Sequence, residues 1–239
     1  MKPYRDLPEC FRNDDVKKYY DILKKKTFSL GLKRIFDIVV SMIMLIILSP
    51  VFLVLAIAIK LDSKGPVFYR QERITKYGKT FRIFKFRTMV ANADKIGSLV
   101  TVNNDSRITR VGGFIRKCRL DEICQLIDVF RGTMSFVGTR PEVKKYVDAY
   151  TDEMYATLLM PAGVTSLASI NYKDEEKLLS GAEDTDSTYI NRILPDKMKY
   201  NLEYIEKFGF FYDIKLMFMT VFAVLKKEKE EKTGEKVNG

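Results

Sequence analysis

The chain has 239 residues, of which 41 are basic and 31 acidic, giving a formal charge of +10. It has no histidine, which excludes His-based catalysis, Ser-His-Asp triads and His-ligated zinc in this chain. The three cysteines, Cys10, Cys118 and Cys124, form neither a paired framework nor a metal-ligand spacing, which indicates a reducing, cytosolic setting. The positive charge suits an anionic membrane surface, a nucleic acid or phosphorylated substrates.

Residues 1–32 form a polar N-terminal extension that contains lysine clusters. We predict a short helix at 14–26 lying on anionic headgroups, with a solvated or partly disordered extension as the alternative. No cleavable signal peptide is expected, because the apolar run that follows starts too far into the chain, is too long and has no small-residue cleavage site.

The long apolar run lies within residues 33–62 and carries Ser49-Pro50 close to its middle. It is long enough to cross a bilayer. Proline removes a helical hydrogen bond, however, and each half of a broken helix would be too short to cross. Both flanks are basic, beginning with Lys33-Arg34, and such charge marks the cytoplasmic side. We therefore predict a re-entrant hairpin of two helices broken at Ser49-Pro50; a single-pass anchor with a proline kink is the alternative.

Residues 67–74 and 79–89 predict two strands around a turn at Tyr77-Gly78. In the second strand, Lys85 and Arg87 are interleaved with aromatic and aliphatic residues. This pattern is typical of a solvated sheet face, and it could also present the two cations to an anion.

A basic cluster follows, with glycines between its members: Arg107, Arg110, Arg116, Lys117 and Arg119. Arginine's planar fork suits phosphate contacts. Directly after the cluster, Asp121 and Glu122 begin a predicted helix with a buried apolar face. Ordinary helix starts place an N-cap and a first-turn charge in this way. Beside a basic cluster, Asp121 is also placed to attack a bound phosphoryl group.

Arg140-Pro141 ends a glycine-bearing connection, and Pro141 is expected to open a helix at 141–150. The start of that helix, with Arg140 beside it, would form another anion-binding point. Residues 208–226 predict an in-plane amphipathic helix at the membrane surface, with a buried core helix as the alternative. The charged residues 228–239 are expected to be a disordered tail.

An ordered set of motifs resembles the bacterial sugar transferase family of monotopic phosphoglycosyl transferases. The matching stretches are Lys33-Arg34-Ile-Phe-Asp37, Ser49-Pro50, Gly65-Pro66-Val-Phe, Phe84-Lys85-Phe86-Arg87-Thr88-Met89, Asp105-x-Arg107-Ile-Thr-Arg-Val-Gly112, Arg119-Leu-Asp121-Glu122, Gln125-Leu126, Arg131-Gly132-x-Met-Ser-Phe-Val-Gly138-x-Arg140-Pro141 and Tyr212-Asp213-Ile-Lys-Leu. The resemblance implies a mostly helical α/β domain at 63–227, held at the cytoplasmic face of a bacterial inner membrane by the re-entrant hairpin, with an interfacial C-terminal helix.

The resemblance also implies a reaction. A phosphosugar would pass from a nucleoside diphosphate sugar, usually a UDP-sugar, to polyprenyl phosphate, with release of UMP. This would be the initiating membrane step in assembly of a glycoconjugate such as a capsule, exopolysaccharide, O-antigen or protein-linked glycan. By similarity, Asp121 is the nucleophile and Glu122 completes the dyad, with a loosely defined role at the metal or lipid phosphate. Mg²⁺ would be held by Asp121. The phosphate-binding candidates are Arg107, Arg116, Arg119 and Arg140, followed by Lys85, Arg87 and Pro141. The expected partners are donor, acceptor and membrane lipids, without nucleic acid; homo-oligomerisation stays open.

The sequence departs from the family pattern at four places. Cys124 and Thr139 replace common prolines, the run from Pro161 lacks the family's Gly-Trp pair, and residues 173–195 look enlarged. The last two put the identity of the sugar in doubt. Two other functional readings compete: a single-pass anchor carrying a basic, non-catalytic anion-binding domain, and direct transfer to polyprenyl phosphate without a covalent intermediate.

Overall fold

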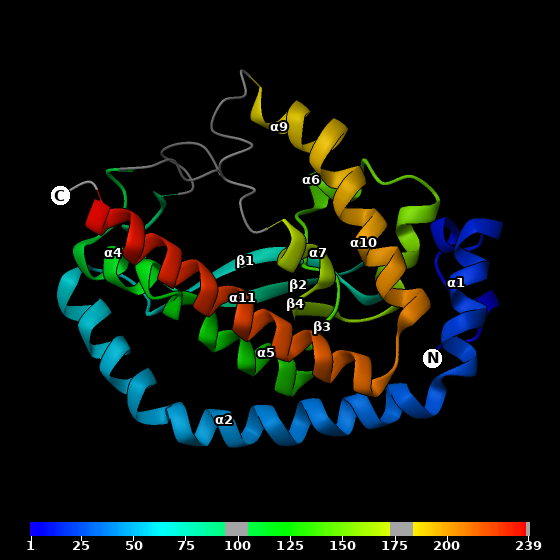
Figure 1. Ribbon diagram of the computed structural model, residues 1–239, viewed down its shortest axis with the longest axis horizontal. Coiled ribbons are helices and arrows are strands. Elements are labelled where there is room, and N and C mark those ends of the chain that lie inside the picture. Colours follow the sequence, from blue (N-terminus) through cyan, green and yellow to red (C-terminus); the bar gives the residue numbers. More distant parts are fainter. Residues whose placement is uncertain (94–104, 173–183, 238–239) are drawn as a thin grey trace.

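A computed structural model describes residues 1–93, 105–172 and 184–237 (Figure 1). The fold is mostly helical, with two small two-stranded sheets at its centre. In chain order, the elements are η1 (Tyr4–Asp6), η2 (Glu9–Phe11), α1 (Asp14–Lys25), α2 (Thr27–Asp62), β1 (Phe68–Thr75), η3 (Lys76–Gly78), β2 (Lys79–Phe86), α4 (Arg110–Lys117), η4 (Leu120–Gln125), α5 (Leu126–Arg131), β3 (Met134–Val137), α6 (Lys144–Val147), η5 (Glu153–Leu159), β4 (Ala162–Thr165), α7 (Leu167–Asn171), α9 (Thr185–Thr188), η6 (Tyr189–Ile193), α10 (Leu194–Lys207) and α11 (Phe210–Val237). Of the η elements, η6 is a π-helix and the others are 3-10 helices.

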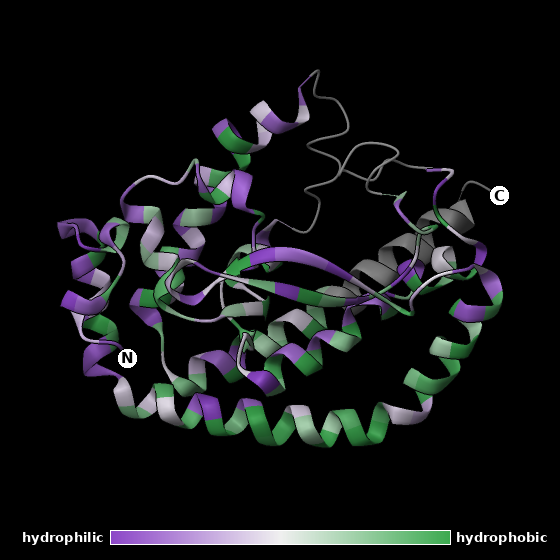
Figure 2. Cartoon of the chain, turned by 180° about the vertical axis from the view of Figure 1, so that it is seen from behind, coloured by the Kyte–Doolittle hydropathy of each residue, from purple (hydrophilic) through white to green (hydrophobic). Residues whose placement is uncertain are grey.

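The predicted break at Ser49-Pro50 is wrong, because α2 continues through Pro50 as one helix of 36 residues. Pro50 has no N–H to donate to the carbonyl of Ile46, one turn earlier. The Ser49 hydroxyl donates to that carbonyl instead, at 2.8 Å. With this carbonyl satisfied, the helix bends rather than breaks. Figures 1 and 2 show α2 as an arc whose two ends turn toward the rest of the chain.

The two sides of this arc differ in polarity. Lys33, Asp37 and Ser41 follow one another at four-residue spacing on the inner side, and all three are buried. The outer side carries exposed apolar residues, and Figure 2 shows the middle of α2 as largely hydrophobic. These residues include Ile35, Ile46, Ile47, Leu53, Val54, Ile57 and Leu61. Within the described part of the chain, α2 is the one helix long and apolar enough to cross a membrane.

The basic residues before the apolar run are not flanking surface charges, which corrects their expected role. Lys33 is 5% exposed; its ammonium lies 2.5 Å from the Asp213 carboxylate of α11 and donates to the Val137 carbonyl at 2.8 Å. Arg34 donates to the carbonyls of Val129 and Phe130, both at 2.7 Å, near the end of α5. Both side chains therefore fasten α2 to the protein interior.

The predicted hairpin is confirmed, except that its second strand ends at Phe86 and not at residue 89. β1 and β2 pair antiparallel from Phe68↔Phe86 to Thr75↔Lys79, and the turn between them lies at Tyr77-Gly78. Both turn residues have positive φ, 60° at Tyr77 and 72° at Gly78, which reverses the chain within a few residues. The second sheet pairs β3 and β4 in parallel, with Met134 opposite Ala162. The sequence indicated a connection, not a strand, at 134–137.

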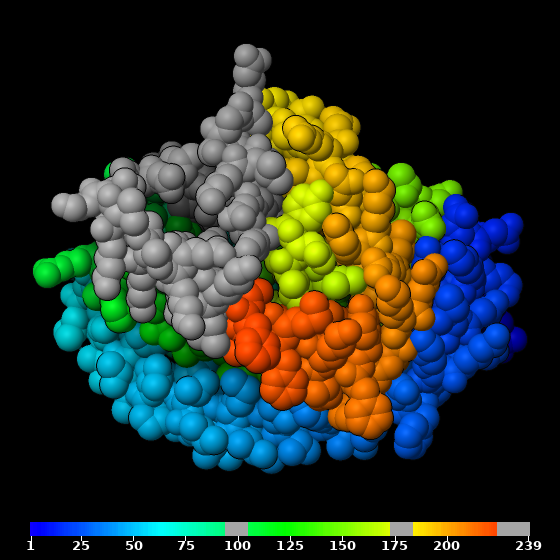
Figure 3. Space-filling model, in the orientation of Figure 1, coloured from blue at the N-terminus to red at the C-terminus, as the bar shows by residue number. Residues whose placement is uncertain are grey.

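The N-terminal helix forms as expected, but the solvated-extension alternative is wrong. Asn13 caps α1 by accepting a hydrogen bond from the Val16 amide at 2.8 Å. Val16 and Leu23 are fully buried in the main core, and the Tyr19 hydroxyl donates to Glu153 of η5 at 2.7 Å. In Figure 3, α1 lies against the flank of α10.

The last helix is longer than predicted. α11 extends to Val237, so the expected disordered tail at 228–239 is helical over most of its length. Leu216 is fully buried in the core, whereas Phe211 is 83% and Phe222 69% exposed. One side of the helix therefore packs on the core, as the alternative predicted, and the other side carries exposed aromatic residues. Its place at the membrane surface stays a prediction.

Gly112 allows α4 to approach the backbone at Thr88, two residues after the end of β2. A β-carbon on Gly112 would lie 2.0 Å from the Thr88 carbonyl oxygen, whereas one on Gly113 would meet only the Ile108 side chain, at 3.9 Å. We expect Gly112→Ala to lower the free energy of unfolding by about 1–3 kcal/mol. Gly113→Ala, in the same helix, should be neutral or slightly stabilising. Thermal melting of both variants checks this, and equal melting temperatures would contradict it.

Candidate active site

The candidate carboxylates lie on η4, which starts after an unusual backbone turn. Arg119 adopts φ 52° and ψ 27°, in the left-handed region, and takes the N-cap position expected for Asp121. Asp121 and Glu122 then occupy the first turn of a 3-10 helix, which passes into α5 at Leu126. The predicted helix therefore exists, but its first part is tighter than an α-helix.

Glu122 is held by two cations from different parts of the chain. Lys85 of β2 lies 2.8 Å from its Oε1, and Arg140, in the loop after β3, lies 2.7 Å from the same oxygen. A second Arg140 nitrogen lies 3.4 Å from Oε2. Burial alone would raise the pKa of Glu122, but the charges and hydrogen bonds of Arg140 and Lys85 outweigh it and hold that pKa well below its usual range. Glu122 is therefore ionised and oriented.

Asp121 is in a different situation. Among the residues that the structure describes, its carboxylate forms no ion pair. Burial raises its pKa, and the neighbouring charge of Glu122 raises it further, while Lys85 and Arg116 act in the opposite direction. The site thus contains one carboxylate, Glu122, that is bound to two cations, and a second, Asp121, that forms no ion pair with the described residues and can act as a nucleophile.

Asp128 fixes the distance between the hairpin and the dyad. Its buried carboxylate accepts a hydrogen bond from the Phe84 amide at 2.8 Å, which ties β2 to α5 one residue before Lys85. The Thr133 hydroxyl donates to the Asp128 carbonyl at 3.1 Å. In the sequence, Asp128 lies within the helix predicted to begin at Asp121. An acidic residue within an apolar helical face was the signal that could have identified it.

The other predicted phosphate-binding residues are distributed around this centre. Arg116 reaches the Thr88 hydroxyl at 3.0 Å, and Arg119 is exposed. Arg107 pairs with Asp105 at 2.6 Å and donates to the Ala93 carbonyl at 2.9 Å. The hydrogen bonds from Arg107 lower the pKa of Asp105 to about 2.

Arg87 and Pro141 are placed differently from the expectation. The Arg87 guanidinium is buried and donates to the carbonyls of Ser63 and Lys64, both at 2.7 Å, so it binds the end of α2. Pro141 is buried and opens no helix, because α6 begins at Lys144 and has four residues. The anion-binding helix start predicted at Pro141 is therefore absent from the described chain.

A family profile described as bacterial sugar transferase matches residues 28–227. The chain belongs to the bacterial sugar transferase family. The match includes the candidate site and runs from the start of α2 to the exposed aromatic residues of α11. It begins just after α1, so the docked N-terminal residues precede the part that the family shares.

Several similar proteins are named for the reaction that they catalyse. A UDP-N-acetylgalactosamine-undecaprenyl-phosphate N-acetylgalactosaminephosphotransferase of Aeromonas hydrophila is 36% identical, over 71% of this chain and 38% of the relative. A UDP-glucose:undecaprenyl-phosphate glucose-1-phosphate transferase of Escherichia coli is 37% identical, over 70% of this chain and 34% of the relative. An uncharacterized sugar transferase of Bacillus subtilis is 33% identical, over 74% of this chain and 78% of the relative. The matched part thus spans little more than a third of the first two relatives.

Proposed function

We propose that this chain transfers a sugar phosphate from a UDP-sugar to undecaprenyl phosphate and releases UMP. The observation that carries the proposal is the dyad: an Asp121 carboxylate that forms no ion pair within the described residues, beside a Glu122 that is bound by Lys85 and Arg140. Support also comes from the family, in which relatives are named for the transfer of sugar phosphates to undecaprenyl phosphate.

In the proposed mechanism, a carboxylate oxygen of Asp121 attacks the phosphorus that bears the sugar. The bond from this phosphorus to the bridging oxygen breaks, and UMP leaves with that oxygen. An oxygen of undecaprenyl phosphate then attacks the same phosphorus and displaces Asp121, which gives undecaprenyl diphosphosugar. Such double displacement predicts ping-pong kinetics. Phosphoryl transfer depends mainly on positioning and charge neutralisation, which Lys85, Arg116 and Arg140 would supply.

A magnesium ion fits this set of residues as a substrate-bound ion. Among the described residues, no group of three or more acidic, thiol or imidazole side chains could hold a metal. Mg²⁺ is commonly bound through one or two carboxylates together with substrate phosphates, and Asp121 offers one such carboxylate. When bound, the ion would neutralise diphosphate charge. Glu122 is less suited as a ligand, because Lys85 and Arg140 occupy its oxygens.

We further propose that α2 enters the cytoplasmic leaflet of the bacterial inner membrane and leaves on the same side. Three features support this: the apolar outer side of the arc, the contacts of its first part with α5 and α11, and the contact of Arg87 with its end. The exposed aromatic residues of α11 would lie at the same surface. The acceptor phosphate also lies at headgroup level, so such a site would act without extracting the lipid.

The native cysteines test this topology. Cys10 precedes α2 and Cys118 follows it, and both are exposed, whereas Cys124 is buried. Single-cysteine variants should react with a membrane-impermeant maleimide at both Cys10 and Cys118 in inverted vesicles, and at neither in intact cells. Cys124 is the unreactive control in both preparations. Labelling of Cys10 and Cys118 from opposite sides would establish the single-pass reading instead.

The pH dependence of the first half-reaction should reveal the coupling within the dyad. Asp121 must be ionised to attack, and its pKa is raised by burial and by Glu122, so the acidic limb of kcat/KM should lie above the ordinary aspartate value of 3.8. In Glu122→Gln, one negative charge is lost, the pKa of Asp121 falls, and the limb should move to lower pH while activity decreases. Glu203→Gln, on the surface of α10, is the control. A limb that moves upward in Glu122→Gln would contradict this assignment.

A panel of UDP-sugars tests the proposed reaction itself. Solubilised protein, magnesium and undecaprenyl phosphate are incubated with each donor, and the released nucleotide is identified. UMP release with lipid-dependent turnover would support the proposal and identify the sugar. Release of UDP would mean that the sugar alone is transferred, and absence of turnover with every donor would favour a non-catalytic anion-binding domain.

A further inference from the structure

Glu142, in the loop that carries Arg140, forms a buried polar trio with Tyr189 and Lys197. The Tyr189 hydroxyl lies 2.5 Å from Oε1 of Glu142, and the Lys197 ammonium lies 2.8 Å from that hydroxyl and 3.4 Å from the same carboxylate oxygen. Exposure is 8% for Glu142, 5% for Tyr189 and 4% for Lys197. The three residues come from the loop after β3, from the π-helix η6 and from α10.

Glu142 is joined to Arg140 by a short and well-fixed piece of chain. The Gly163 amide donates to the Thr139 carbonyl at 2.9 Å, and the Ile74 amide donates to the Glu142 carbonyl at 3.0 Å. The backbone is therefore held on either side of Arg140. The Glu142 side chain adds a third attachment, to Tyr189 and Lys197.

Arg73 of β1 is a further charged residue in this region. Burial chiefly lowers its pKa, while Glu142 raises that pKa and Arg140 lowers it further. A tilted contact between the rings of Tyr146 and Tyr189, 4.4 Å between centroids, fixes the hydroxyl that bonds to Glu142.

We infer that Lys197 and Tyr189 are positioning residues for Arg140. By holding Glu142, they set the loop so that Arg140 reaches Glu122 beside Asp121. Among the described residues, neither Lys197 nor Tyr189 bonds to Asp121 or Glu122, so each acts through Glu142. The inference deepens the proposed function and rests on it where activity is the readout.

A double-mutant cycle tests the inference. Lys197→Met and Tyr189→Phe are each made in the wild-type and in an Arg140→Met background. In the wild-type background, we expect kcat/KM for the UDP-sugar to fall about 10- to 100-fold, because small displacements of a positioned group are costly. In the Arg140→Met background, the same changes should have less than about a twofold effect, since the group that they position is gone. Equal losses in both backgrounds would overturn the inference.

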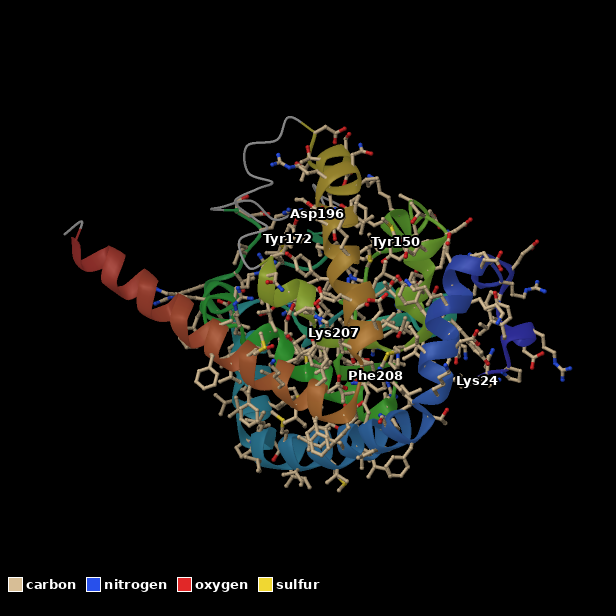
Figure 4. All side chains as sticks on the ribbon, turned by 45° about the vertical axis from the view of Figure 1, so that its right-hand side comes forward. Lys24, Tyr150, Tyr172, Asp196, Lys207 and Phe208 are labelled. Atoms are coloured by element: carbon tan, nitrogen blue, oxygen red, sulfur yellow. The ribbon has the colours of Figure 1, made fainter. Side chains whose placement is uncertain are left out.

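Lys199→Met is the matched control. This lysine lies on the same helix, and its side chain is 76% exposed and bonded to Asp196 at 2.8 Å. Figure 4 shows Asp196 near the start of α10, far from Lys207 at its other end. The control should leave kcat/KM unchanged. Tyr189→Phe removes one oxygen atom from a ring that otherwise keeps its packing, so it tests the trio even if Lys197→Met folds poorly.

A chemical readout separates failure of the inference from failure of the proposed function. The rate at which phenylglyoxal modifies Arg140 is measured by peptide mass spectrometry and compared with the exposed Arg119 in the same sample. Tyr189→Phe and Lys197→Met should raise the rate at Arg140 severalfold and leave Arg119 unchanged. Wild-type protein that releases no UMP would refute the proposed function, whereas unchanged modification of Arg140 would refute the positioning role whatever the activity.

Discussion

Replacing Asp121 with asparagine should reduce UMP release by at least about a thousandfold, because the carboxylate that forms the covalent bond is lost. Asparagine has nearly the same size, and the wild-type carboxylate forms no ion pair in the described chain, so the fold should be preserved. Turnover with undecaprenyl phosphate, measured as UMP released, checks the result. Asp148→Asn, at an exposed carboxylate paired with Lys144, should keep full activity.

Intact-mass measurement without the acceptor distinguishes the covalent route from direct transfer. Wild-type protein incubated with donor alone should gain the mass of one sugar phosphate and release one UMP per chain. Asp121→Asn should do neither, and Glu122→Gln should gain the adduct slowly. Full activity of Asp121→Asn would disprove the nucleophile assignment. An active wild-type protein that never forms the adduct would favour direct attack by the lipid phosphate.

Replacing Lys33 with methionine should lower the free energy of unfolding by about 3–5 kcal/mol, because it leaves the Asp213 carboxylate buried without its cation. The two side chains are each 6% exposed and lie 2.5 Å apart. The Tyr204 hydroxyl also donates to Asp213, at 2.8 Å, but a neutral partner does not balance the charge. Denaturant or thermal unfolding in detergent, followed by circular dichroism, measures the loss.

Two further variants show whether charge is the cause. The double variant Lys33→Met/Asp213→Leu removes both charges and should recover much of the loss. Lys17→Met breaks an exposed pair with Asp21 and should change stability by less than about 1 kcal/mol. A loss in Lys33→Met no larger than that in Lys17→Met would show that the buried pair does not fasten α2 to α11.

Local patterns in the sequence were sufficient for several elements. Alternation of apolar and polar residues predicts both strands of the hairpin. Tyr77-Gly78 is predicted as the turn because glycine readily adopts the positive φ that a tight turn needs. The position of Asp121 beside a basic cluster, together with the family resemblance, made Asp121 and Glu122 the candidate site. The apolar run predicted the long helix, although the break at Pro50 did not follow, since the nearby Ser49 hydroxyl replaces the lost donor.

Contacts between distant segments decided the rest. The basic cluster of five cations at 107–119 lies directly before Asp121, yet the cations that bind Glu122 are Lys85 of β2 and Arg140 in the loop after β3. Lys33 and Arg87 look like surface charges in sequence but are buried, one beside Asp213 and the other on the carbonyls that end α2.

The sequence by itself thus determined the hairpin, the long apolar helix and the family, and it indicated the candidate dyad, because periodicity, turn residues and short motifs are local. Only the tertiary structure decided the partners of each charge. A charge is stabilised by whatever group the fold brings within a few ångströms, and that distance is unrelated to separation along the chain. For the same reason, only the tertiary structure brings Glu142, Tyr189 and Lys197 together, because they come from three different segments of the chain.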